Sequence, residues 1–326
     1  MKIVLTGATG FVGRALVSNL SILTGSREPI EIRALVRTPA QFVAPENVTV
    51  FPGSVTDIPE GLFFDEPHVL IHLGVKQIDH DGTGFDEDNV FGTKNLLSNT
   101  NQHTLGVIYG STLSVLGQGA QSNTSERDVI NPQTPLARSR AEAERLILTK
   151  MKQDKHWGFC LRPRFILDVS DKFVLPGIQG LAKKGLYIGN GQQRFSIISV
   201  QDYAKIIIEL VEYILLDNGQ KPVQQTPLNV GYRRPVTFDS IFSGFRLEMS
   251  YRSKVKRLRM PGWLPLLLKG AKNRKLTAKA VQLELIGFDH YGDVNKLETF
   301  IGDEITKKDG EDILYQMIKD ITTTSC

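Results

Sequence analysis

The chain has 326 residues, of which 41% are hydrophobic and 23% charged, ordinary values for a globular protein with ample length to bury a core. Its net charge of +4 is too small and too scattered to indicate a nucleic-acid partner. Cys160 lies in an apolar run and Cys326 is the last residue, so we expect no disulfide and a reducing compartment. We find no signal peptide before the first strand, and no apolar run reaches the roughly 18 residues of a membrane span. These features predict a cytoplasmic protein.

Short apolar, β-branched runs alternate with amphipathic runs through the first half of the chain. We expect strands at 2–5, 30–36, 48–51, 68–73, 105–110 and 159–166, with the clearest helices at 88–99 and 137–152. This alternation predicts an α/β fold with a Rossmann-type, doubly wound parallel sheet and helices on both faces. In the helix 137–152, the apolar residues form one face, and we expect Glu142, Glu144 and Arg145 on the opposite, solvent face.

The first strand runs directly into a glycine turn, and an apolar, helix-compatible run follows. The glycines are Gly7, Gly10 and Gly13. In a strand–turn–helix unit, the first glycine permits the tight turn and the second lets the backbone approach a diphosphate, which lies on the helix N-terminus. The third glycine lets the helix pack close to the strand. The turn therefore predicts a dinucleotide site, and the alternative is a plain tight turn.

The spacing G-x-x-G-x-x-G after Thr6 resembles the short-chain dehydrogenase/reductase superfamily. Three later segments resemble its extended, epimerase/dehydratase-like branch: V-L-I-H-L-G at 69–74, N-V-F-G-T-K-N-L-L at 89–97, and V-Q-D-Y-A at 200–204. The resemblance implies that His72 is a structural histidine of the fourth strand, and the other histidines and acids show no metal-ligand spacing. It also implies an interleaved organisation. Residues 1–165 with about 196–232 would form the NAD(P)-binding domain, and about 166–195 with 233–326 a smaller mixed α/β substrate lobe.

The second strand ends without an acidic residue that could accept hydrogen bonds from the ribose of NAD. Arg37 follows it, and an arginine there can pair with the 2′-phosphate of NADP, assisted by Arg14. We therefore favour NADP over NAD, with a solvated loop arginine as the alternative. Gly53-Ser54-Val55 resembles the family's adenine-contacting G-D-L segment. The resemblance assigns cofactor contacts to Gly7, Thr9, Gly10, Phe11, Val12, Gly13, Arg37, Ser54, Val55, Leu73, Gly74, Val75 and Arg140.

In this superfamily, a Ser or Thr after the fifth strand orients the substrate, a Tyr acts as general acid/base, and a Lys four residues later lowers the pKa of that Tyr. The segment 110–117 resembles the family's S-S-S-A-x-V-Y-G, which puts the catalytic hydroxyl at Thr112, with Ser111 as the neighbouring alternative. The segment 135–144 resembles P-Y-x-x-S-K-x-x-x-E. Leu136 stands in place of the Tyr and Arg140 in place of the Lys. The site is therefore predicted to be degenerate.

Two further segments depart from the family at the same end of the site. The residues that usually read V-Y-G-P are Ile166-Leu167-Asp168-Val169, and Phe195 replaces an arginine that grips nucleotide-sugar phosphates, with Arg194 before it. A Y-x-x-x-K at Tyr315 and Lys319 lies in a terminal amphipathic helix, and we reject it as catalytic.

Two functions follow from the resemblance and its departures. The first is an NAD(P)-binding member without ordinary redox catalysis, with a cofactor-sensing or regulatory role. The second is an active NADP-dependent reductase, epimerase or dehydratase that acts on a sugar nucleotide or another small hydroxy or carbonyl substrate, with Thr112, Tyr109 or Lys76 as the substitute acid. We expect a small-molecule ligand in the C-terminal lobe. By analogy with the family, we also expect a homodimer through the helices at 88–99 and 137–152.

Overall fold

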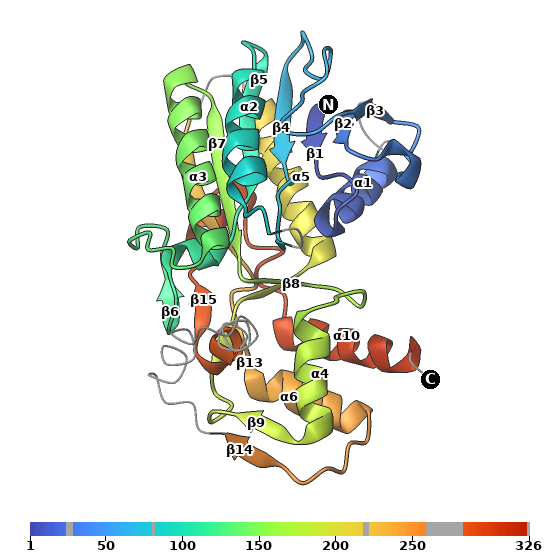
Figure 1. Cartoon of the computed structure of the whole chain (residues 1–326), viewed down its shortest axis with the longest axis vertical. Coiled ribbons are helices and arrows are strands. Elements are labelled where there is room, and N and C mark those ends of the chain that lie inside the picture. The colour runs from blue at the N-terminus through green and yellow to red at the C-terminus, as the bar shows by residue number, and fades with distance from the viewer. Residues whose placement is uncertain (24–28, 80–81, 218–221, 259–282, 325–326) are drawn as a thin grey trace.

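The computed structural model describes residues 1–23, 29–79, 82–217, 222–258 and 283–324 (Figure 1). Arg259 and Cys326 lie outside these ranges. Cys160 is a buried, free thiol in the main sheet, where it pairs with Tyr109. In the described part of the chain, no helix is long and apolar enough to cross a membrane.

Seven parallel strands form the main sheet, in the order β12-β7-β5-β4-β1-β2-β3. Every residue of β4 and all but one of β5 are buried, as expected for central strands covered on both faces. The predicted fold class is confirmed. The strands are β1 Lys2–Thr6, β2 Glu31–Val36, β3 Val48–Pro52, β4 His68–His72, β5 Thr104–Gly110, β7 Trp157–Pro163 and β12 Gln225–Val230.

Two layers of helices cover the sheet (Figure 1). Alternate residues of β1 point to the two layers, so that Ile3 and Leu5 join one hydrophobic core and Val4 the other. The first layer holds α1 Phe11–Leu23 and α5 Val200–Leu216, and the second holds the π-helical turn η2 Glu87–Phe91, α2 Gly92–Ser98 and α3 Pro135–Asp154.

A smaller lobe lies beyond the carboxyl ends of the strands (Figure 1). Its sheets are short: β13-β10-β15-β6, the pair β11-β8 and the pair β14-β9. Its elements are β6 Gln121–Thr124, β8 Phe165–Leu167, α4 Val174–Lys184, β9 Leu186–Ile188, β10 Arg194–Phe195, β11 Ile197–Ser199, β13 Val236–Thr237, α6 Phe238–Glu248, β14 Lys256–Leu258, β15 His290–Gly292 and α10 Gly310–Thr324. The short helices η1 Pro39–Gln41, η3 Leu113–Leu116 and α9 Asn295–Ile301 lie with the main sheet, where α9 packs against α5 and β12.

Three details differ from the sequence-based expectations. The strand expected at 159–166 leaves the main sheet at Pro163, and residues 165–167 pair instead with β11. The helix expected at 88–99 begins as the π-turn η2, which encloses the Asn89 side chain. That amide bonds the backbone N–H and carbonyl of Lys76 at 2.7 and 3.0 Å. Glu144 was expected in solvent but is 1% exposed, because a buried arginine pairs with it.

Candidate functional site

The turn between β1 and α1 is so tightly packed that two of its positions admit only glycine. Gly7 has φ +78°, and a Cβ there would lie 2.6 Å from the Leu73 carbonyl carbon. A Cβ at Gly13 would lie 2.1 Å from the Gly7 carbonyl oxygen. The first turn of α1 is therefore held against the ends of β1 and β4, with its leading N–H groups free of intrahelical partners. A diphosphate fits such a cradle, because these donors and the helix dipole favour an anion.

The predicted cofactor residues around this turn lie together. Phe11 is 42% exposed at the start of α1, and the Arg14 Nε donates to the Thr9 carbonyl at 2.8 Å. The segment after β4 approaches from the other side, where the Gly74 N–H donates to Thr6 Oγ1 at 2.9 Å. The structure therefore places 7–13 and 73–75 at one edge of the sheet, where parallel strands end.

The three residues predicted to contact the adenosine of the cofactor differ in how accessible their side chains are. Arg37 is exposed directly after β2. The Ser54 hydroxyl is occupied within its own turn, where it bonds Thr56 Oγ1 at 2.8 Å and accepts the Asp57 N–H at 3.1 Å. Val55 is buried against Gly92 and belongs to the core beneath this turn. Of these three residues, only Arg37 presents a free side-chain surface to a ligand.

His72 organises a hydrogen-bond chain below the glycine turn. Thr93 Oγ1 donates to the Asn89 carbonyl at 2.7 Å, so it accepts from His72 Nε2 at 2.9 Å. Nδ1 therefore accepts from Thr6 Oγ1 at 2.8 Å. Burial, with a smaller effect of the Arg140 charge, lowers the pKa of His72 to about 3. The ring therefore joins β1 to α2 through its two hydrogen bonds, and the described residues contain no cluster of metal-ligating side chains.

Ser111 is bound inside the protein. Its hydroxyl donates to Glu144 Oε1 at 2.5 Å, and Arg162 donates to both oxygens of the same carboxylate at 2.9 and 2.5 Å. Glu144 and Arg162 are each 1% exposed. The sequence patterns did not reveal this network, although Glu144 lies within the segment 135–144 quoted for the resemblance.

Thr112 is half-buried at the start of η3, where its hydroxyl accepts the Ser114 N–H at 3.2 Å. Accepting this bond leaves its O–H proton available, so Thr112 can still orient a ligand. Arg164 reaches the same loop, with Nη1 donating to Ser114 Oγ at 2.8 Å. Burial lowers the pKa of Arg164 to about 10, and its Nε has no partner among the described residues.

Leu136 and Arg140 lie in the first two turns of α3, which Thr134 caps. Leu136 is half-buried, and Arg140 is buried with its guanidinium turned inward, where Nη2 donates to the Gly110 carbonyl. The guanidinium carbon lies 5.2 Å from the Tyr109 ring centroid. Arg140 Nε and Nη1 and the Tyr109 hydroxyl have no hydrogen-bond partner among the described residues. Arg140 is therefore a buried cation that supports the end of β5.

A second tyrosine reaches this strand end from the opposite helix layer. Tyr203 on α5 is buried, yet its hydroxyl oxygen lies only 3.7 Å from the point where a Gly110 Cβ would stand. Burial raises the pKa of Tyr203, and the nearby positive charge of Arg140 acts in the opposite direction. The sequence patterns gave Tyr203 no role at this strand end, because its helix is distant from β5 along the chain.

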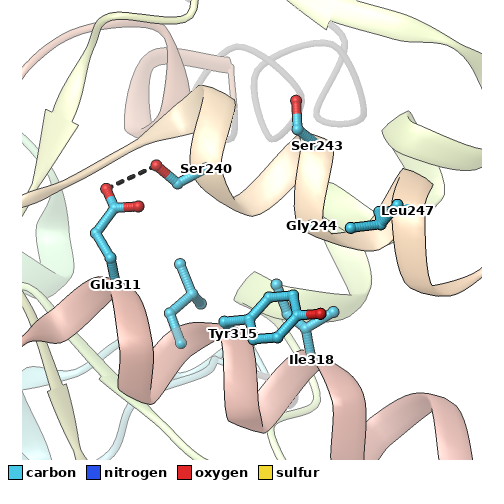
Figure 2. Close-up of a pocket in the computed structure, with 8 residues that line it drawn as sticks. Ser240, Ser243, Gly244, Leu247, Glu311, Tyr315 and Ile318 are labelled. Atoms are coloured by element: carbon cyan, nitrogen blue, oxygen red, sulfur yellow. Dashed lines mark hydrogen bonds between the residues drawn. The ribbon is translucent and has the colours of Figure 1, made fainter.

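Two cavities lie away from the end of β5. One of about 350 Å³ lies between α6 and α10, where Ser240 donates to Glu311 at 2.6 Å (Figure 2). Tyr315, of the rejected Y-x-x-x-K, lines this cavity and donates its hydroxyl to Glu248 at 2.6 Å. A second cavity, of about 550 Å³, lies between α1 and the η1 segment and includes Arg14.

Solved structures share this fold over the whole chain. MoeE5, solved with UDP-glucose and NAD, is 18% identical with a TM-score of 0.72, and covers 100% of this chain and 99% of its own. A UDP-N-acetylglucosamine 4-epimerase from Methanobrevibacter ruminantium M1 is 18% identical with a TM-score of 0.69, over 99% and 97% of the two chains. These likenesses establish the fold.

Curated relatives match by sequence. A decarboxylating sterol-4-alpha-carboxylate 3-dehydrogenase of Candida albicans is 23% identical over 56% of both chains. A 2-alkyl-3-oxoalkanoate reductase of Stenotrophomonas maltophilia is 26% identical over 63% of both. The chain thus matches less than two thirds of the length of either relative. Residues 4–259 match the model of the 3-beta hydroxysteroid dehydrogenase/isomerase family, and the chain therefore belongs to that family.

Proposed function

We propose that this protein binds a nicotinamide dinucleotide by its diphosphate and does not use it for tyrosine-dependent redox chemistry. Its role would be cofactor-sensing or regulatory. The observation that carries the proposal is the inward orientation of Arg140, which donates to the Gly110 carbonyl and has no phenol beside it on α3. The diphosphate cradle supports binding, and the strand end supports the loss of the usual proton relay.

Three groups would normally work together at this end of the cleft: a hydroxyl, a phenol and an ammonium. Here the Thr112 hydroxyl keeps an available proton and Ser111 is bound to Glu144, but Leu136 has no proton to transfer and Arg140 supports the backbone. A bound nicotinamide cofactor supplies hydride acceptance or donation, but a proton must move at the substrate oxygen as well. Loss of a positioned acid/base lowers a rate by about 10²–10⁴.

We propose NADP rather than NAD as the dinucleotide. Arg37 is exposed at the end of β2, where the adenosine ribose lies in proteins of this architecture, and no acidic residue ends that strand. A guanidinium pairs with a phosphate more strongly than with a ribose hydroxyl, because the hydrogen bonds are charge-assisted.

The test begins with binding. The purified protein would be titrated with NADPH, NADH, NADP⁺ and NAD⁺ by calorimetry, and the wild type would then be incubated with NADPH and a panel of carbonyl substrates. We expect saturable binding of the NADP forms and no turnover at ordinary rates. Turnover on the order of 1–10³ s⁻¹ would overturn the regulatory role, and absence of dinucleotide binding would overturn the proposal as a whole.

The second candidate is an active NADP-dependent reductase, epimerase or dehydratase. The solved neighbours were studied with sugar nucleotides, which keeps that substrate class open. The names of the two curated relatives favour another class, because each denotes a carboxylate with an apolar body. Arg164 lies close to Ser114 and the Thr112 loop, and its guanidinium could pair with such a carboxylate. Thr112 or Tyr203 would then replace the missing phenol.

Single variants separate the two candidates. If the enzyme is active, Thr112→Ala abolishes turnover, whereas Arg164→Gln raises KM for a 3-oxo acid with little change in kcat. Tyr203→Phe removes only the hydroxyl and tests that group alone. Unchanged rates in both Thr112→Ala and Tyr203→Phe would remove these residues from the mechanism.

We also propose a homodimer that packs through η2, α2 and α3. Phe91, at the end of η2, is 58% exposed, which supports an apolar contact there. Sedimentation of the wild type and of Phe91→Ser tests it, and an unchanged monomer in both would overturn it.

A further inference from the structure

Two segments of the small lobe are strongly basic. Residues 172–192 and 249–258 contain no Asp or Glu. The C-terminal end of α4 and the segment leading into β14 instead present six exposed cations, which we call the basic patch: Lys183, Lys184, Arg252, Lys254, Lys256 and Arg257. The chain as a whole has a net charge of only +4, so this patch is a local concentration of charge.

Backbone hydrogen bonds hold the two segments of the basic patch together. The Lys256 N–H donates to the Gly185 carbonyl at 2.7 Å, and β14 runs parallel to β9 from that point. Arg246 on α6 also holds the two segments together, because its guanidinium donates to the Ser253 carbonyl at 2.8 Å and to the Ala182 carbonyl at 3.0 Å. The cations therefore stand on an ordered scaffold.

The nearby carboxylates bond to tyrosine hydroxyls and not to the cations of the patch. Asp239 accepts the Tyr187 hydroxyl at 2.5 Å, and Glu248 accepts the Tyr315 hydroxyl at 2.6 Å. None of the six cations forms an ion pair with a carboxylate of the described residues, although Arg257 lies over the Tyr187 ring at 5.2 Å. Unpaired cations gathered on one surface attract an anionic partner.

The apolar side chains within the patch indicate what kind of anion it meets. Val255 and Leu258 are 43% and 42% exposed, and they alternate with the cations along the chain. Single-stranded nucleic acids are bound by exposed aromatic rings on which bases stack, but the aromatic residues beside these cations are covered: Tyr187 is 6% exposed and Tyr251 is half-buried. Aliphatic residues among Lys and Arg suit a lipid surface, where the cations meet headgroups and the apolar groups enter the interface.

We propose that the basic patch docks the protein on the surface of an anionic lipid membrane, as a peripheral contact. The pair β9–β14 lies at the end of the molecule farthest from the seven-stranded sheet (Figure 1). Docking there leaves the edge of the sheet, with the glycine turn, open to ligands. The inference does not depend on whether the protein catalyses a reaction.

The experiment is co-sedimentation of the full chain with phosphatidylcholine vesicles that contain or lack about 30 mol% phosphatidylserine. We expect binding only to the anionic vesicles, and loss of binding at high salt because screening weakens surface charge attraction. The variant with Lys183, Lys184, Lys254 and Lys256 changed to Gln should bind at least about tenfold more weakly. A matched control changes four exposed lysines outside the patch, Lys94, Lys152, Lys307 and Lys319, to Gln and should bind like the wild type.

A further variant separates a lipid partner from a nucleic-acid partner. Val255→Ser with Leu258→Ser should weaken vesicle binding and leave the affinity for a single-stranded oligoribonucleotide unchanged. Equal binding to neutral and anionic vesicles would overturn the proposal, as would equal losses in the patch variant and its matched control. Tighter binding to the oligoribonucleotide than to anionic vesicles at the same salt would overturn it in favour of a nucleic acid. Thermal unfolding of each variant confirms that it is folded.

Discussion

The two ends of the proposed cofactor cleft differ in whether backbone or side-chain groups form them. The diphosphate end consists of backbone, with Gly7 and Gly13 packed so closely that no side chain fits at either position. The nicotinamide end depends on side chains, and there Leu136, Arg140 and Ser111 are packed or bonded inside the protein. A site made of backbone is retained as long as the fold is retained, whereas a site made of side chains can be lost while the fold persists.

The largest expected effects come from substitutions in the glycine turn at the backbone end of the cleft. Gly13→Ala puts a Cβ 2.1 Å from the Gly7 carbonyl oxygen and should destabilise the protein by more than about 4 kcal/mol. Gly10→Ala meets the same oxygen at 3.2 Å, so it should fold with a loss below about 1 kcal/mol. Since the second glycine admits the diphosphate, its affinity for NADPH should nevertheless fall about tenfold or more. Urea unfolding and calorimetry measure both effects, and normal NADPH affinity in Gly10→Ala would contradict the assigned contact.

The second prediction concerns the side-chain end. Glu144→Ala leaves Arg162 charged, buried and unpaired and should cost about 3–5 kcal/mol of folding free energy. The matched control is Glu142→Ala on the same helix, whose pair with Arg145 is solvent-exposed and contributes about 0–1 kcal/mol. Denaturant unfolding compares the two. Similar losses in both variants would show that the Ser111–Glu144–Arg162 network does not support this end of the cleft.

The third prediction tests the choice of dinucleotide. Arg37→Ala should weaken NADPH binding about tenfold, or about 1.4 kcal/mol, because one charge-assisted phosphate contact is removed. NADH has no 2′-phosphate, so its affinity should stay the same. Calorimetry on both dinucleotides gives the ratio, and parallel losses for the two would assign Arg37 a general role at the adenine side.

The smallest effect concerns His72, which lies between the two ends. Burial lowers its folded-state pKa to about 3, whereas the unfolded chain takes up a proton near pH 6.5. The stability that His72 contributes is therefore present above pH 6.5 and is lost as the pH falls from 6.5 toward 3. In His72→Gln, the slope of unfolding free energy between pH 6.5 and 5 should be shallower by about 1 kcal/mol per pH unit. His290, with a folded pKa of about 3 from the same cause, adds a slope of the same sign, as do His68 and His156, whose pKa values burial also lowers.

The sequence predicted the parallel sheet because its central strands are short apolar runs with helical periodicity between them. It also predicted that Arg37 follows β2, since a strand end is a local feature. The predicted strand 159–166 was wrong at its end. Pro163 ends β7, and the next strand, β8, pairs with β11 instead of continuing in the main sheet.

The identity of the residues at the catalytic positions could be read from the sequence, but their orientation could not. Arg140 was expected to contact the cofactor, and the structure turns its guanidinium to the Gly110 carbonyl, 30 residues away. Ser111 meets Glu144 across 33 residues, and Tyr203 reaches β5 from another helix layer. Such contacts depend on how the helices pack on the sheet, which one-dimensional patterns do not contain.

The hydrogen-bond chain through His72 has a mechanical consequence. It begins at the Gly74 N–H beside the glycine turn, passes through Thr6, His72 and Thr93 to the Asn89 backbone, and the Asn89 side chain then donates to Ser139. Ser139 in turn donates to the Leu136 carbonyl in the first turn of α3. A continuous series of hydrogen bonds therefore connects the loop after β4 with the first turn of α3. A displacement of the loop after β4 is therefore coupled to the first turn of α3 through the interior of the protein.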